Sequence, residues 1–195
     1  MWDSGIFGGV LISLTYITLL CEAIIPSIDF TPELTKYNWP PNIRDAFTKT
    51  KYYKGLAAYC QLFKPKKVLE LGTCSGASAV ALSKYDGHVD TYDIHNKLVD
   101  IRINNNSISI NLLEQPADIL SITYTPYDLI FVDLDHQGWL EEEIHKKLLL
   151  EYNGIEFYDD VQKNDMVNFW WNINNDKMIL NWNVFGFGIV RYGQI

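Results

Sequence analysis

The stretch VLELGTCSGASAV, residues 68–80, decides the fold of this chain. Its apolar first half predicts a buried strand, and the run of small residues from Ala77 onward predicts a helix that can pack closely on a sheet. Between them lies a Gly-Thr-Cys-Ser-Gly loop that begins at Gly72 and ends at Gly76. A loop of such small residues allows a ligand to approach the backbone closely.

The composition is that of one globular domain. The chain has 195 residues, of which 48% are hydrophobic and 21% charged, and its net charge is −8. Proteins that bind nucleic acids normally present a basic face, so we expect no nucleic-acid partner and instead a small neutral or cationic ligand. The three cysteines form no CxxC pattern, and this odd number without a disulfide framework predicts a reducing, cytoplasmic location.

The N-terminal segment carries no charge over residues 4–21. This length is near the lower limit for a membrane span, but no Lys or Arg precedes it as in a signal peptide. We therefore favour a buried or partner-covered helix, with a membrane anchor or an oligomer interface as alternatives. Residues 31–41, which contain three prolines, predict a loop that could act as a lid. Residues 1–50 would thus pack on a main domain formed by residues 51–195.

Strands and helices are expected to alternate along the main domain. Strands are expected within residues 67–71, 88–94, 109–115, 127–135 and 154–160, and two more around Gly186; helices are expected within residues 42–63, 76–85, 138–153 and 164–173. This order predicts an α/β, Rossmann-like doubly wound sheet that is mostly parallel, with helices on both faces. The short connection at Gly186 predicts an antiparallel C-terminal strand.

Ligands of such open sheets bind beyond the carboxyl ends of the strands. The loop after Leu71 lacks the G-x-G-x-x-G pattern, because Cys74 stands where the second glycine would be. Glu70 would repel a phosphate and suits a ligand that carries a positive charge. Asp93, at the end of the second strand, can accept both hydroxyls of a ribose. A ribose joined to a cationic group without phosphate describes S-adenosylmethionine.

The run VLELGTCSGASAVALS resembles the first motif of class I S-adenosylmethionine-dependent methyltransferases. With YDLIFVDLDHQGWLEEEIHKKLLLEYNGIEFYDDV, it is similar to the small O-methyltransferases of the catechol and caffeoyl-CoA type and to the macrocin methyltransferase and cephalosporin-hydroxylase-like group. The similarity covers residues 51–192. It implies O-methylation of a small hydroxylated substrate. The alternative is an S-adenosylmethionine-binding regulatory or partner-binding module without turnover, and either protein could be a homo-oligomer.

The resemblance also implies a cofactor site. The residues expected at the methionine end are Glu70, Gly72, Thr73, Ser75, Gly76 and Ser78. Asp93 would hold the ribose, and the residues expected near the adenine are Ile94, His95, Gln115, Ala117 and Asp118. Asp133 could hold the amino group of the cofactor.

Three carboxylates at the ends of the fourth and fifth strands form a candidate magnesium site. Neighbouring strands lie about 4.8 Å apart, so Asp133 and Asp159 should end side by side, with Asp160 as a third oxygen ligand. The resemblance places His136 where related enzymes often have a lysine, which makes His136 a candidate general base next to Asp133. The alternatives are that Asp159 and Asp160 cap a helix near Lys163 and that His136 is an ordinary polar residue.

Aromatic side chains near the strand ends could stack on the methyl acceptor. The candidates are Trp39, Trp139 and Tyr158. The acidic run of residues 141–143 is expected to lie on a solvated helix face, and His145 on the surface.

Overall fold

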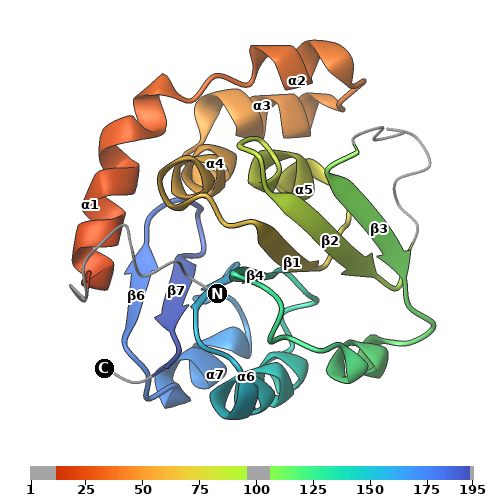
Figure 1. Ribbon diagram of the computed structural model, residues 1–195, viewed down its shortest axis with the longest axis vertical. Helices are drawn as coiled ribbons and strands as arrows, with labels where there is room; N and C mark the ends of the chain where they lie inside the picture. Colours follow the sequence, from red (N-terminus) through yellow and green to blue (C-terminus); the bar gives the residue numbers. More distant parts are fainter. Residues whose placement is uncertain (1–11, 96–105, 194–195) are drawn as a thin grey trace.

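A single mixed sheet forms the centre of the computed structural model, which describes residues 12–95 and 106–193. Its strands, in the described residues, are β1 (Lys67–Leu71), β2 (His88–Asp93), β3 (Ile108–Leu112), β4 (Leu129–Val132), β5 (Ile155–Tyr158), β6 (Lys177–Leu180) and β7 (Phe187–Arg191). They are arranged in the order β3-β2-β1-β4-β5-β7-β6 (Figure 1). The first five pair in parallel, and β7 runs antiparallel to both of its neighbours. The expected Rossmann-like architecture is confirmed.

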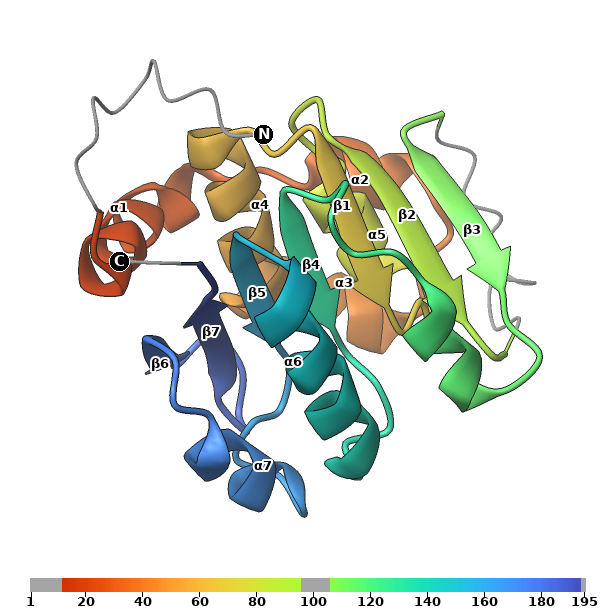
Figure 2. The same cartoon turned by 60° about the horizontal axis from the view of Figure 1, so that its bottom comes forward.

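Helices cover both faces of the sheet (Figures 1 and 2). One face carries α1 (Leu14–Ile24), α2 (Thr31–Lys36), α3 (Pro41–Lys49), α4 (Tyr52–Phe63) and α5 (Ala77–Leu82); the other carries α6 (Trp139–Glu151), α7 (Met166–Asn172) and the 3-10 helix η3 (Pro116–Ser121). Side chains alternate along each strand, so Val68 joins the core beneath the first set of helices and Leu69 the core beneath the second. The sheet therefore separates two apolar cores.

The region before β1 differs from the sequence prediction. The helix expected over residues 42–63 is two helices, interrupted at Thr50, whose backbone is extended and whose hydroxyl donates to the carbonyl of Ala46 at 2.7 Å. The segment expected to be a loop contains α2. Pro32 stands in the first turn of α2, where a missing N–H costs nothing, and Lys36 in the last turn suits the helix dipole.

The N-terminal helix α1 packs on the core with one side and faces outward with the other. Leu14, Ile17 and Cys21 are buried, whereas Tyr16 and Leu19 are exposed. A short 3-10 turn, Ile25–Ser27, follows it. No helix among the described residues is long and apolar enough to cross a membrane.

A buried polar network interrupts the core on the α6 and α7 face. The hydroxyl of Tyr192 donates to the carboxylate of Glu156, which is fully buried on β5, and Nδ1 of His145 contacts the same hydroxyl. His145 is therefore a core residue and not the surface residue that was expected. Burial raises the pKa of Glu156 to about 8 and lowers the pKa of His145 to about 4. Both groups are consequently held neutral near pH 7.

Candidate active site

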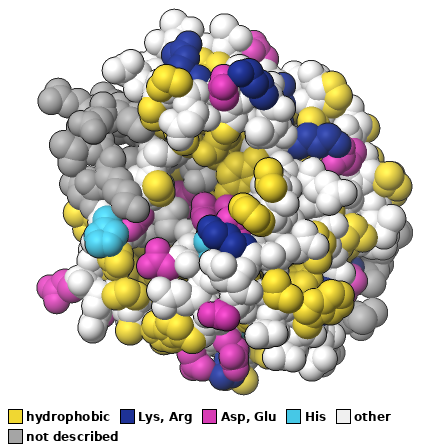
Figure 3. Space-filling view, turned by 180° about the vertical axis from the view of Figure 1, so that it is seen from behind, with side chains coloured by type: hydrophobic (Ala, Val, Ile, Leu, Met, Phe, Trp, Pro, Cys, Tyr) yellow, Lys and Arg dark blue, Asp and Glu magenta, His cyan; other side chains and the backbone are white. Residues whose placement is uncertain are grey.

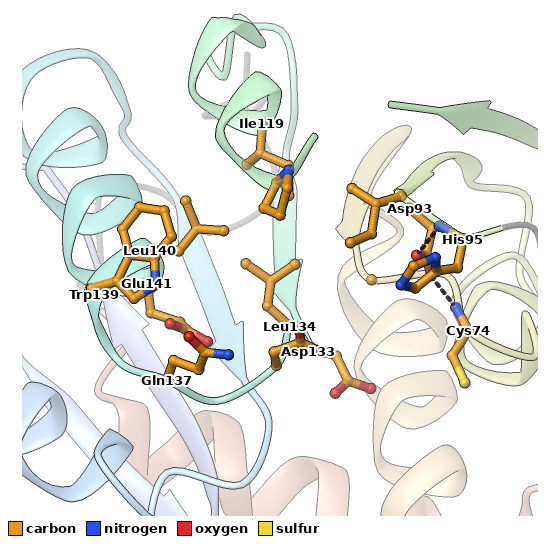
Figure 4. A pocket seen from close by; sticks show the side chains of 14 residues that line it. Cys74, Asp93, His95, Ile119, Asp133, Leu134, Gln137, Trp139, Leu140 and Glu141 are labelled. Carbon is orange, nitrogen blue, oxygen red and sulfur yellow. Dashed lines mark hydrogen bonds between the residues drawn. The ribbon is translucent and has the colours of Figure 1, made fainter. Parts of the chain in front are cut away.

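A cavity of about 260 Å³ opens at the carboxyl ends of the central strands. The sheet order places the ends of β2, β1 and β4 next to one another, so the loops that follow them meet. Figure 4 shows the side chains of Cys74, Asp93 and His95 on one side of the cavity and of Leu134, Trp139 and Leu140 on the other. The cavity lies where ligands of open α/β sheets bind.

The two glycines of the loop after β1 are required by its geometry. Gly72 has φ +105°, and a Cβ atom there would lie 1.8 Å from the carbonyl oxygen of Asp133. The loop after β1 thus touches the backbone at the end of β4. Gly76, with φ +73°, forms the left-handed N-cap of α5. Gly72 in particular leaves no space for a side chain beside the end of β4.

Asp93 is oriented toward the cavity by backbone hydrogen bonds. Its Oδ2 accepts from the N–H of Cys74 at 2.7 Å, and its Oδ1 accepts from the N–H of His95 at 2.8 Å (Figure 4). Asp93, Ile94 and His95 all line the cavity. Each carboxylate oxygen of Asp93 keeps a second lone pair. The carboxylate can therefore accept the hydroxyls of a ribose in the cavity.

Three of the residues expected at the methionine end of the cofactor, Glu70, Thr73 and Ser78, lie beneath the loop. They are not among the described residues that line the cavity. Glu70 is fully buried, and Thr73 and Ser78 are buried with it. The hydroxyl of Thr73 lies 2.6 Å from that of Thr91. Burial raises the pKa of Glu70 to about 7. These side chains support the loop from below, while Ser75 and Gly76 form the turn itself.

The residues expected to border the adenine from the third strand point elsewhere. Gln115 and Ala117 are exposed and Asp118 is half-buried, and none of the three is among the described residues that line the cavity. Asp118 instead accepts hydrogen bonds from the backbone and side-chain amides of Gln115, at 3.0 and 3.1 Å. This capping interaction turns η3 so that Pro116 and Ile119 face the cavity. Two neighbours of the expected residues in this segment, Pro116 and Ile119, line the cavity instead.

The start of α6 supplies much of the opposite wall. Glu141, expected on a solvated face, is buried, and its Oε2 accepts from the N–H of Gly138 at 3.0 Å. The next residue, Glu142, pairs with Lys146 on the solvated side as expected. Glu141 was not expected in the cavity wall, although its position three residues after Gly138 is that of a capping box.

Of the three candidate aromatic residues, Trp139 alone is placed to meet a ligand. Trp139 lines the cavity and is 51% exposed. Trp39 is 3% exposed and packs on Phe47, with ring centroids 5.4 Å apart. Tyr158 is fully buried. The expectation that Trp39 or Tyr158 stacks on the acceptor is therefore wrong.

An acidic cluster adjoins the cavity. One ligand atom each from Asp133, His136 and Asp159 lies within 4.8 Å of the other two. Asp160, the third expected ligand, lies at the edge of this group: its carboxylate accepts from Asn183 at 2.9 Å and lies 3.6 Å from Nε2 of His136. Figure 3 shows acidic side chains gathered in a hollow of one face, with hydrophobic side chains nearby.

Two side chains that the sequence analysis did not identify hold these carboxylates. The hydroxyl of Tyr52, at the start of α4, donates to Oδ2 of Asp133 at 3.3 Å. The amide of Asn183, in the β6–β7 connection, donates to Asp159 and Asp160. Both residues are far from their partners in the sequence, so no local pattern could have revealed them.

The electrostatics of the cluster favour a cation. Burial and the neighbouring Asp159 raise the pKa of Asp133 well above its usual range. Burial and Asp160 raise the pKa of Asp159 to about 7. Burial also lowers the pKa of His136, which favours a neutral imidazole. The two carboxylates fit a divalent cation such as Mg²⁺ or Mn²⁺, and the neutral imidazole of His136 would add a nitrogen ligand of the kind that transition-metal ions prefer.

The helix-capping alternative has no support in the described residues. The helix that follows is α7, and its N-cap is Asp165, whose side chain makes no capping hydrogen bond. The side chains of Asp159 and Asp160 are directed to Asn183.

No protein-family model matches the sequence, and no curated protein matches it. The structure is similar to several solved structures. A methyltransferase of Podospora anserina, PaMTH1, bound to S-adenosylhomocysteine, has a TM-score of 0.62 and 18% identity over 96% of this chain and 100% of that one. The O-methyltransferase TomG of Streptomyces achromogenes, in complex with S-adenosylmethionine, has a TM-score of 0.56 and 16% identity over 84% and 94% of the two chains.

An O-methyltransferase of Bacillus cereus in complex with S-adenosylhomocysteine has a TM-score of 0.51 and 17% identity over 97% of this chain and 96% of that one. Together these similarities confirm the expected fold, that of class I S-adenosylmethionine-dependent methyltransferases.

Proposed function

We propose that this chain is an S-adenosylmethionine-dependent methyltransferase that methylates an oxygen of a small hydroxylated molecule with the help of a divalent cation. The observation that carries the proposal is the position of Asp133. This residue lines the cavity and also belongs to the acidic cluster. A nucleoside in the cavity and a cation at the cluster would therefore lie on two sides of one residue.

The residues of the cavity suit the methyl donor, which supplies an electrophilic methyl group when bound. Asp93 can accept the ribose hydroxyls, and Gly72, which lines the cavity, presents no side chain to a ligand. Leu134, Leu140 and Ile119 provide apolar walls for a planar base. The likeness to methyltransferases that contain S-adenosylmethionine or S-adenosylhomocysteine supports this assignment.

The acidic cluster suits the acceptor. A divalent cation held by Asp133 and Asp159 would lower the pKa of a nearby hydroxyl group. Nε2 of His136 lies 3.5 Å from Asp133. A neutral imidazole can take a proton or complete the ligand set, and the cation affinity of His136→Ala distinguishes these two roles. The exposed ring of Trp139 can contact a donor or an acceptor at the rim.

Calorimetry and a methyl-acceptor screen test the proposal. We expect the wild-type protein to bind S-adenosylhomocysteine and to transfer labelled methyl groups from S-adenosylmethionine to members of a panel of catechols, phenols and sugars, with Mg²⁺ present. We expect Asp159→Ala to keep the affinity for S-adenosylhomocysteine and to lose the dependence on Mg²⁺. Asp45→Ala, at an exposed site on α3, is the control and should change neither property.

Two outcomes would contradict the proposal in different ways. Failure of the wild-type protein to bind S-adenosylhomocysteine would exclude methyl transfer. Binding without turnover of any acceptor would favour the cofactor-binding module that the sequence analysis left as the alternative.

A further inference from the structure

Tyr52 and Asn183, the two side chains that donate hydrogen bonds to the acidic cluster, are both linked to the N-terminal helix α1 through the residue that precedes each of them. Tyr52, which donates to Asp133, follows Lys51, and Nζ of Lys51 lies 2.6 Å from Oε2 of Glu22. Asn183, which donates to Asp159 and Asp160, follows Trp182. Nε1 of Trp182 donates to Oε1 of Glu22 at 2.9 Å. Glu22 of α1 therefore contacts the residue directly before each of the two holding side chains.

Trp182 packs tightly against α4 and β7. Trp182 is 3% exposed, and its ring lies on Gly55 of α4, where a Cβ atom would come within 2.3 Å of the indole. The centroid of the same ring lies 5.1 Å from that of Phe187 at the start of β7. The β6–β7 connection is thus pressed between α4 and the end of the sheet, with Glu22 at its edge.

We propose that Glu22 is a positioning residue for the cation cluster. This inference rests on the function proposed above. By accepting from Lys51 and Trp182 at once, the Glu22 carboxylate fixes the start of α4 relative to the β6–β7 connection. The Tyr52 hydroxyl and the Asn183 amide are then held at the separation that places Asp133 beside Asp159. This role would account for the N-terminal region, which the methyltransferase resemblance leaves unexplained.

The two contacts of Glu22 differ in strength. The ion pair with Lys51 is partly exposed, and such pairs contribute little. The indole N–H of Trp182 belongs to a buried ring, so loss of its acceptor leaves a buried donor unpaired. The larger share of the effect should therefore come through Trp182.

The position of Glu22 predicts a selective effect. Among the described residues that line the cavity, none is Glu22, Lys51 or Trp182. A change at Glu22 should therefore weaken cation binding and leave nucleoside binding unchanged. A general loosening of the fold would weaken both.

Titration of the full-length protein with Mn²⁺, as a probe cation, and with S-adenosylhomocysteine tests this role. We expect Glu22→Ala to weaken Mn²⁺ binding about tenfold and to change the Kd of S-adenosylhomocysteine less than twofold. Glu22→Gln keeps an oxygen for the indole N–H, so it should weaken Mn²⁺ binding less than threefold. Asp45→Ala, which breaks the exposed pair of Asp45 and Lys49, is the matched control and should change neither affinity.

The outcomes separate this inference from the proposed function. If the wild-type protein and Glu22→Ala bind Mn²⁺ equally well, the role of Glu22 is wrong and the cation site stands. The role of Glu22 is also wrong if Glu22→Ala weakens the binding of Mn²⁺ and of S-adenosylhomocysteine equally. It is wrong, too, if Glu22→Gln weakens Mn²⁺ binding as much as Glu22→Ala does. If the wild-type protein does not bind Mn²⁺, the proposed cation site fails and the role of Glu22 fails with it.

Discussion

Replacement of Glu156 by glutamine should make the stability of the protein less sensitive to alkaline pH. Glu156 is fully buried on β5, and its pKa is raised from 4.5 to about 8 by burial. A carboxyl group whose pKa is raised on folding contributes stability that is complete below pH 4.5 and is lost as the pH rises through 8. At about 1.4 kcal/mol for each pKa unit, the loss is about 2 kcal/mol at pH 6 and about 5 kcal/mol at pH 9.

The glutamine side chain has nearly the same shape and carries no charge at either pH. Its amide oxygen can accept from the hydroxyl of Tyr192, which donates to Glu156 in the wild-type protein. Between pH 6 and pH 9, the stability of Glu156→Gln relative to wild type should therefore increase by about 3 kcal/mol.

Urea unfolding followed by tryptophan fluorescence measures this difference. The exposed Glu143→Gln variant is the control, and its stability relative to wild type should change little between the two pH values. If the difference between Glu156→Gln and wild type is the same at pH 6 and pH 9, Glu156 is ionised in the folded protein at both pH values. The reasoning from burial would then be refuted.

Three further substitutions test the cavity by calorimetry with S-adenosylhomocysteine. Asp93→Ala should weaken binding at least tenfold, because a charge-assisted hydrogen bond contributes about 1.5–3 kcal/mol; unchanged affinity would exclude the ribose contact. Asp118→Ala should leave the affinity unchanged, because Asp118 does not line the cavity; a clear loss would support its expected position beside the adenine. Gly72→Ala should abolish binding and lower the Tm, because the added Cβ meets the carbonyl of Asp133. A Gly72→Ala protein with wild-type Tm and affinity would contradict the close approach of the two loops.

The strands could be predicted from the sequence because parallel strands covered on both faces are short apolar runs. The strand β1 was predicted with its observed bounds, Lys67–Leu71. The expected third strand was displaced, since β3 ends at Leu112 and a turn leads from there into η3. The helices before β1 were predicted less well. One helix ends at Lys49 and the next begins at Tyr52, and periodicity does not detect so short an interruption.

The residues at strand ends could be predicted because topology alone brings them together. This holds for Gly72, Asp93, Asp133 and Asp159, each of which follows or ends a strand of the central sheet. The sequence could not reveal Tyr52, because the start of α4 reaches the cluster only through tertiary packing.

His136 lies with Asp133 and Asp159 in the cluster, and Asp160 lies at its edge. Both residues have positive φ, +50° for Asp160 and +57° for His136. A left-handed backbone redirects a side chain relative to an extended one, and such conformations are rare outside glycine. The turns that follow β4 and β5 therefore decide where the side chains of His136 and Asp160 are directed, and the strand ends alone do not predict this.

The contact between Gly72 and the backbone of Asp133 has a consequence for how such a protein can change. The spacing between the proposed nucleoside and cation regions is set by contact between two main-chain segments, and side-chain replacement at the rim cannot widen it. Mutation of rim residues such as Trp139 could alter which hydroxyl compound is accepted, while the separation of donor and acceptor stays the same. New acceptor specificities are therefore accessible by few substitutions, whereas a longer gap between the two regions would require a rebuilt sheet.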